Sequence, residues 1–117
     1  MREITHFIDG ASVAGTSGRY GDVFNPNTGE AQARVALAST AEVDKAVASA
    51  LRAQQTWALV NPQRRARVMF EFKRLIERDM DALAELLSSE HGKVIADSKG
   101  DVQRGLEVIE FACGIPH

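Results

Sequence analysis

The chain has 117 residues, of which 44% are hydrophobic and 26% are charged, and these ordinary proportions exclude wholesale disorder. Its net charge of −2 at pH 7 is too small to indicate a nucleic-acid or membrane partner. No apolar run approaches the roughly 20 residues that cross a bilayer, and a single cysteine cannot form an internal disulfide. Without a secretory leader in residues 1–20, these features predict a cytoplasmic protein of at most one domain.

Residues 1–38 carry most of the turn signals and are predicted to form a first region of short β-strands. Thr5–Asp9 precedes Asp9-Gly10, a dipeptide that favours a tight hairpin turn. Ser12–Ala14 is therefore the expected return strand of a first hairpin.

A second hairpin is expected further along the same region. Loops are predicted at Thr16-Ser17-Gly18 and at Tyr20-Gly21, before a short strand at Asp22–Phe24. Residues 25–29 (Asn-Pro-Asn-Thr-Gly) are a strong turn signal, because proline presets φ and asparagine or glycine tolerates left-handed backbone. The loosely alternating segment Ala31–Leu37 is expected to pair back across this turn.

Residues 39–117 are predicted to form a second, helical region with about four helices. Ser39 and Glu42 fit a capping box at the start of the first helix. Asn61-Pro62 opens the second helix, with asparagine as the cap and proline in the first turn, where its missing N–H costs little. Apolar residues recur at helical spacing in both segments, so each is expected to have one buried face.

The third and fourth helices complete this region. Asp79 is expected to cap the third helix, and Gly92 suits its left-handed C-terminal cap. The fourth helix is predicted from about Ile95 to Ala112, with an apolar stripe of Val102, Leu106, Ile109 and Cys113. Gly105 interrupts this helix and is predicted to mark the close approach of a neighbouring backbone. The residues alone thus indicate an α+β or α/β fold.

Cysteine and histidine predict neither a catalytic nor a metal site. Cys113 falls on the apolar stripe near a helix C-terminus, whereas a catalytic thiolate needs a helix N-terminus or adjacent cations, so we expect a core residue. His6, His91 and His117 are scattered, without the spacing of zinc ligands. The sequence shows no glycine-rich phosphate loop and no serine nucleophile elbow. We therefore assign no catalytic, cofactor-binding or metal-binding residue.

Arg104 is the one candidate for ligand binding. It shares a predicted helix face with Asp97 and Asp101 and is followed by Gly105, which removes side-chain bulk. In one interpretation Arg104 pairs with Asp101 or Glu107, each three residues away, for a few tenths of a kcal/mol. In the other, its planar guanidinium binds a substrate carboxylate through two parallel hydrogen bonds. Residue patterns alone favour the first interpretation.

The order and spacing of several short motifs is similar to the N-terminal part of the aldehyde dehydrogenase superfamily. The motifs are His-Phe-Ile-Asp-Gly at 6–10, Phe-Asn-Pro-Asn-Thr-Gly-Glu at 24–30, Trp57, Arg-Arg-Ala-Arg at 64–67 and Ser-Glu-His-Gly-Lys at 89–93. Residues 100–117 (Gly-Asp-Val-Gln-Arg-Gly-Leu-Glu-Val-Ile-Glu-Phe-Ala-Cys-Gly-Ile-Pro-His) resemble the CoA-acylating methylmalonate-semialdehyde dehydrogenase branch more narrowly. The resemblance covers essentially the whole chain.

This resemblance implies that the chain is part of an α/β, NAD-binding domain in an enzyme several times longer. Such enzymes oxidise malonate or methylmalonate semialdehyde with NAD and transfer the acyl group to coenzyme A with loss of carbon dioxide. The resemblance places the nucleophilic cysteine, the oxyanion asparagine, the general-base glutamate and most NAD contacts beyond residue 117. It makes Arg104 the expected ligand of the substrate carboxylate.

Two alternatives remain open at this stage. The chain is alternatively part of a non-acylating aldehyde dehydrogenase, or a non-enzymatic helical module that binds a protein. In the leading interpretation, residues 1–117 alone bind no cofactor and are inactive. Apolar stripes that lack their covering sheet favour self-association, so we expect a homo-oligomer. The expected contacts include Phe72, Leu75, Ile109 and Phe111.

Overall fold

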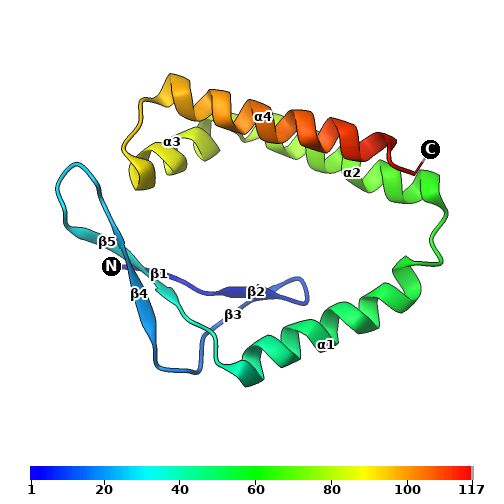
Figure 1. The fold of residues 1–117 in the computed structure, drawn as a ribbon, viewed down its shortest axis with the longest axis horizontal. Helices are drawn as coiled ribbons and strands as arrows, with labels where there is room; N and C mark the ends of the chain where they lie inside the picture. The colour runs from blue at the N-terminus through cyan, green and yellow to red at the C-terminus, as the bar shows by residue number, and fades with distance from the viewer. Residues whose placement is uncertain (117) are drawn as a thin grey trace. The chain divides into compact units, whose positions relative to one another are not determined.

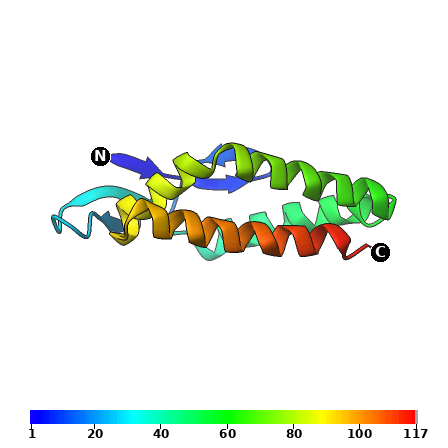
Figure 2. The same ribbon diagram turned by 90° about the horizontal axis from the view of Figure 1, so that it is seen from above.

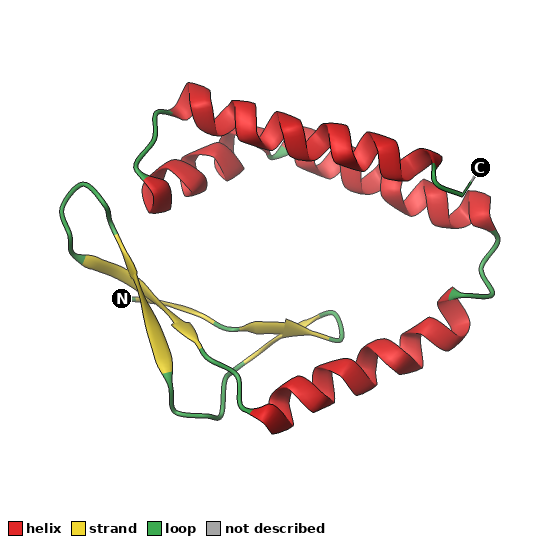
Figure 3. Ribbon diagram, viewed as in Figure 1, coloured by secondary structure: helices red, strands yellow, loops and turns green. Residues whose placement is uncertain are grey.

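The computed structural model describes residues 1–116, and the chain divides into two compact units, Met1–Leu59 and Val60–His117 (Figure 1). The first unit contains the strands and helix α1 (Thr40–Trp57). The second contains helices α2 (Pro62–Arg78), α3 (Met80–His91) and α4 (Ile95–Gly114) (Figure 3). The expected α+β character of this chain is confirmed. None of the helices in residues 1–116 combines the length and the hydropathy needed to span a membrane.

The first hairpin forms as predicted. Strands β2 (His6–Ile8) and β3 (Ala11–Val13) pair antiparallel, with His6 opposite Val13 and Ile8 opposite Ala11. The turn between them has φ of +56° at Asp9 and +74° at Gly10. Two successive positive φ angles are typical of the tight hairpin turns that match the twist of the strands, which is why this dipeptide fixes the hairpin.

A three-stranded sheet completes the strands, in the order β1 (Arg2–Ile4), β5 (Ala31–Ala36), β4 (Tyr20–Phe24). Strands β4 and β5 form the expected second hairpin. Strand β1, which pairs parallel with β5, was not predicted.

The predicted loop at Tyr20-Gly21 is wrong, because both residues belong to β4 and pair with Ala36 and Val35. The Arg34 guanidinium lies 4.3 Å from the centre of the Tyr20 ring, and this cross-strand contact favours an extended Tyr20.

Helix α1 begins with the capping box that the sequence predicts. The backbone N–H of Ser39 donates to Glu42 Oε2 at 2.8 Å, and the N–H of Glu42 donates to Ser39 Oγ at 3.3 Å. The apolar side chains of α1, among them Val43, Val47 and Leu51, are about half exposed in this unit. The helix is therefore fixed at its first turn, while most of its apolar face remains open.

The three-helix unit is built on α4, which packs against both α2 and α3. Helices α2 and α4 lie side by side and antiparallel (Figures 1 and 2). The Asn61 side chain caps α2 by accepting from Gln63 N at 2.9 Å, and Pro62 occupies the first turn, as predicted. Small side chains fill the contact between helices. The buried residues are Ala66, Ala84, Ser98, Leu106 and Cys113.

Two predictions about this unit are wrong in detail. Asp79 does stand at the start of α3, but its side chain caps no N–H, because Arg78 donates to both carboxylate oxygens at 2.9 and 2.7 Å. A Cβ at Gly105 would meet no described atom within 4 Å, so the predicted close approach of a backbone is not found. The C-terminal cap of α3 is as expected, with Gly92 at φ +89°.

Candidate functional site

A polar cavity of about 280 Å³ lies along the first half of α4. The lining residues at 97, 100, 101 and 104 recur every three or four positions, which places them on one face of the helix. Gly100 leaves this face open, because a Cβ there would meet no described atom within 4 Å. The residues that line the cavity are Lys93, Ala96, Asp97, Gly100, Asp101 and Arg104.

Asp101 is the centre of the charged groups in this cavity. The Lys93 ammonium contacts one of its carboxylate oxygens, Oδ2. Arg104 Nη1 lies 3.4 Å from the other oxygen, Oδ1. The hydrogen bond from Lys93, with added attraction to Arg104, lowers the pKa of Asp101 below its usual range. Asp101 is therefore an ionised acceptor that is shared unequally between two cations.

The Arg104 side chain is 80% exposed, compared with 23% for Lys93. Among the described residues its one ion pair is the long contact with Asp101, so most of its donors face solvent. The pairing with Asp101 that the sequence offered as the simpler interpretation is present. The pairing with Glu107 is not found among the described residues. Binding of a substrate carboxylate by Arg104 stays a prediction.

Sequence reasoning missed Lys93 as a member of this site. Lys93 precedes α4 and lies eight residues before Asp101 in the sequence. The contact therefore depends on the path of the chain between α3 and α4, and the spacing rule for residues on one helix could not reveal it. The sequence signals were its place directly after Gly92, which ends α3, and its position in the Ser-Glu-His-Gly-Lys motif at 89–93.

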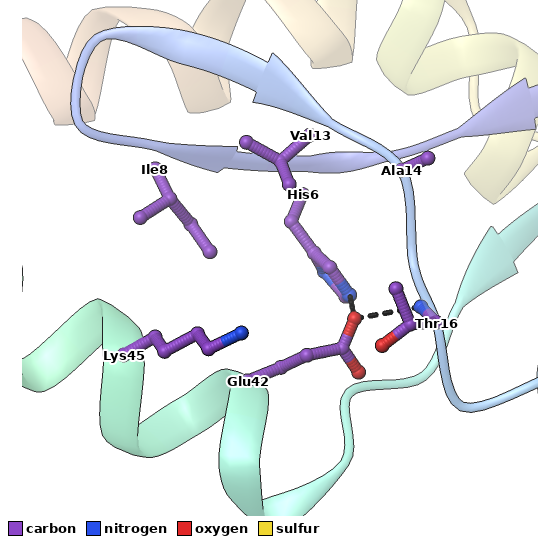
Figure 4. Close-up of a pocket in the computed structure, with 7 residues that line it drawn as sticks. All are labelled: His6, Ile8, Val13, Ala14, Thr16, Glu42 and Lys45. Atoms are coloured by element: carbon purple, nitrogen blue, oxygen red, sulfur yellow. Dashed lines mark hydrogen bonds and ion pairs between the residues drawn. The ribbon is translucent and has the colours of Figure 1, made fainter.

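A second cavity, of about 170 Å³, lies between the β2–β3 hairpin and α1 (Figure 4). Glu42 and His6 point toward each other there, with His6 Nε2 at 3.7 Å from Glu42 Oε1. The same carboxylate oxygen accepts from the backbone N–H of Thr16 at 2.7 Å. The other residues that line this cavity are Ile8, Val13, Ala14 and Lys45.

The environment of Glu42 indicates a structural carboxylate. Backbone hydrogen bonds from Ser39 and then Thr16 lower the pKa of Glu42 to about 2, although burial opposes the shift. Only 9% of the residue is exposed. A carboxylate that is buried, ionised and occupied by two backbone donors is a poor general base, because its conjugate acid forms only in strong acid. Glu42 is therefore not suited to proton transfer at neutral pH.

Cys113 and His91 line neither cavity, whereas His6 lines the second. Cys113 is a free thiol that is 4% exposed in the helical core, as the sequence predicts. Within residues 1–116, no group of three histidine, cysteine, aspartate or glutamate side chains is placed to hold a metal ion. The third histidine considered in the sequence, His117, lies outside the described residues.

Short hairpins followed by helices agree with the resemblance drawn from the sequence motifs. The sequence profile of the aldehyde dehydrogenase family matches residues 13–117. Because this match covers most of the chain, the protein belongs to the aldehyde dehydrogenase family.

Individual relatives narrow this assignment. The chain is 47% identical to malonate-semialdehyde dehydrogenase 3 of Geobacillus kaustophilus over 98% of its own length. It is 41% identical to malonate-semialdehyde dehydrogenase of Pseudomonas aeruginosa over 99% of its length. In each case it spans about a quarter of the relative, 24% and 23% respectively.

Solved structures agree with the sequence relatives. A crystal structure described as a methylmalonate-semialdehyde dehydrogenase from Sinorhizobium meliloti, in complex with NAD, has a TM-score of 0.97 and 61% identity to this chain. That comparison covers 100% of this chain and 24% of the other. Methylmalonate-semialdehyde dehydrogenase from Oceanimonas doudoroffii gives a TM-score of 0.95 at 45% identity, over 99% of this chain and 24% of that one. The resemblance to this branch is thereby confirmed.

Proposed function

We propose that residues 1–117 serve as part of an NAD-dependent, CoA-acylating dehydrogenase that acts on malonate or methylmalonate semialdehyde. The product would be acetyl-CoA or propionyl-CoA, with release of carbon dioxide. The single observation that carries the substrate class is Arg104, an 80% exposed guanidinium at a polar cavity. A carboxylated aldehyde needs such a cation, whereas a simple aliphatic aldehyde does not.

Within this proposal, Arg104 binds and orients the substrate. Its planar fork can hold both oxygens of a carboxylate, which fixes the position of the molecule as well as its charge. The long contact with Asp101 leaves the donors needed for that fork. The aldehyde carbon at the other end of the short substrate is thereby presented at a defined distance from Arg104. Arg104 is thus a substrate-binding residue in this proposal.

NAD and coenzyme A are assigned to the longer enzyme rather than to the described residues. A nucleotide phosphate favours a helix N-terminus preceded by glycine-rich backbone. The start of α4 has Val94 as its N-cap and the acidic Asp97 in its first turn, which does not fit an anionic phosphate. We therefore propose that residues 1–117 alone do not reduce NAD.

The proposal also includes self-association. Phe111 on α4 is 75% exposed, and Phe72 on α2 is also exposed. Leu75 and Ile109 are half-buried within the helical unit and offer less surface. Exposed aromatic residues of this kind favour contact with other protein surfaces, including further copies of the enzyme.

The substitution Arg104→Ala in the enzyme that contains these residues tests the proposed substrate class. We expect kcat/KM for malonate semialdehyde to fall by about 100-fold, the value of a charge-assisted bidentate contact, mainly through KM. The value for propanal, which has no carboxylate, should change by less than about threefold. Steady-state assays of NADH formation with both aldehydes measure this difference.

Gln103→Ala provides the matched control, because Gln103 is an exposed neighbour on the same helix that does not line the cavity. It should leave both aldehydes unaffected. Equal losses with both aldehydes for Arg104→Ala would contradict a carboxylate-binding role.

A further inference from the structure

We propose that Lys93 is a positioning residue for Arg104: it holds Asp101 and thereby keeps the Arg104 guanidinium open to a substrate carboxylate. This inference rests on the proposed function of Arg104. It concerns a residue that does not touch the substrate and acts only through Asp101.

The path of the backbone fixes Lys93 beside Asp101. Gly92, with φ +89°, ends α3 in a left-handed turn, and Val94 is the N-cap of α4. Lys93 is therefore confined between two helices, and its side chain is only 23% exposed. Its ammonium contacts Asp101 Oδ2, while Arg104 reaches only Oδ1, at 3.4 Å.

A second pair with the same spacing shows what Arg104 would do without this competitor. Arg74 follows Glu71 by three residues, and its Nε and Nη2 donate to both carboxylate oxygens at 2.9 and 2.6 Å. Arg78 binds the shorter side chain of Asp79 in the same two-point manner, at 2.9 and 2.7 Å. An arginine three residues after a carboxylate, and an arginine beside an aspartate, can thus each bind both carboxylate oxygens. Glu71 has a longer side chain than Asp101, and Asp79 is adjacent to its arginine, but of these three carboxylates only Asp101 has a lysine on its second oxygen.

Charge balance in the cavity supports the same conclusion. Lys93 and Arg104 are the cations that line it, and Asp97 and Asp101 are the acids. With Lys93 present the two signs are balanced, so an incoming carboxylate meets no net negative charge. Without Lys93 the acids exceed the cations, and Asp101 is free to close on Arg104. Both changes weaken binding of a carboxylate.

The test is Lys93→Met in the enzyme that contains residues 1–117. We expect KM for malonate semialdehyde to rise by about tenfold relative to KM for propanal, with little change in kcat. The double variant Lys93→Met with Asp101→Asn should return the ratio of KM values to within about twofold of the parent, because the competing carboxylate is gone. Lys93→Arg should keep the ratio, since it restores the cation.

Lys99→Met is the control, because Lys99 pairs with Asp81 at 2.7 Å and lies outside the cavity lining. It should leave both KM values unchanged. If Lys93→Met reduces the yield of folded enzyme, the single variant Asp101→Asn tests the proposed role of Lys93 instead. Our proposal expects it to lower or maintain KM for the carboxylated substrate.

The outcomes separate this inference from the function on which it rests. An unchanged ratio of KM values in Lys93→Met, or no rescue by Asp101→Asn, overturns the role of Lys93 when Arg104→Ala still raises KM for malonate semialdehyde selectively. No selective effect of Arg104→Ala overturns the proposed function itself.

Discussion

Glu42 in the first turn of α1 and Asp101 in the first half of α4 are both ionised carboxylates, but their surroundings differ. Glu42 is buried and occupied by the backbone N–H groups of Thr16 and Ser39. Asp101 is partly exposed and is contacted by two side-chain cations, one of them at 3.4 Å. Rigid backbone donors leave a carboxylate no freedom to exchange partners, whereas side-chain cations do. The comparison indicates that the first residue stabilises the fold, whereas in our proposal the second controls how open Arg104 is to a ligand.

Glu42→Ala should give the largest change in stability of the chain. It removes one half of the capping box of α1 and leaves the N–H groups of Thr16 and Ser39 without their acceptor. We expect the melting temperature to fall by about 8 °C. Asp101→Ala, the matched change, should lower it by less than about 2 °C, because exposed ion pairs contribute little. Thermal melts followed by circular dichroism would measure both, and equal losses would remove the distinction.

Acid should remove the stabilising contribution of Glu42. The folded-state pKa of Glu42 is about 2, below its usual value of 4.5, so the unfolded chain binds the proton first. Its contribution to stability is complete above about pH 5 and is lost as pH falls toward 2. Melts at pH 6, 4 and 3 should therefore show that the parent loses more stability than Glu42→Gln, which has no carboxylate to titrate at this position. Parallel pH profiles would contradict the stabilising role of this carboxylate.

Local signals predicted most of the fold. The Asp9-Gly10 turn, the capping box of α1 and the Asn61-Pro62 start of α2 each depend on neighbouring residues, and the structure contains all of them. Strand β1 was missed because its pairing with β5 joins residues 31 apart, as in the ion pair between Glu3 and Arg34. Such contacts depend on the tertiary path of the chain, which no short motif specifies.

The candidate site shows the same limit. Arg104 was singled out by its helix face and by the neighbouring Gly105, and the resemblance of its segment to a known branch of the family then favoured a carboxylate-binding role. Lys93 was not predicted as part of the site because it precedes α4, whereas its partner Asp101 lies within that helix. The hydrogen bond from the Thr16 N–H to Glu42 was not predicted for a similar reason, since 26 residues separate the two. Sequence reasoning thus singled out Arg104 as a candidate and missed Lys93, the residue that we propose positions it.

Gly105→Ala should have the smallest effect, and it tests whether the face beside Arg104 is open. A Cβ at this position meets no described atom within 4 Å, and α4 is helical there. Alanine should therefore stabilise the isolated 117-residue chain by about 0.5–1 kcal/mol, the difference in helix propensity between the two residues. Chemical denaturation followed by circular dichroism measures this gain, and Gly100→Ala, which also has open space, serves as a parallel case.

The same substitution in the longer enzyme gives the more informative result. If another segment of the enzyme packs its backbone against Gly105, alanine must destabilise that assembly even though it stabilises the isolated chain. A stabilising effect in both forms would mean that the glycine leaves room beside Arg104 for a ligand rather than for protein. Opposite signs would restore the close approach that the sequence first predicted, now with a partner outside the described residues. The sign of the change thus separates packing from access at the one position next to the proposed substrate ligand.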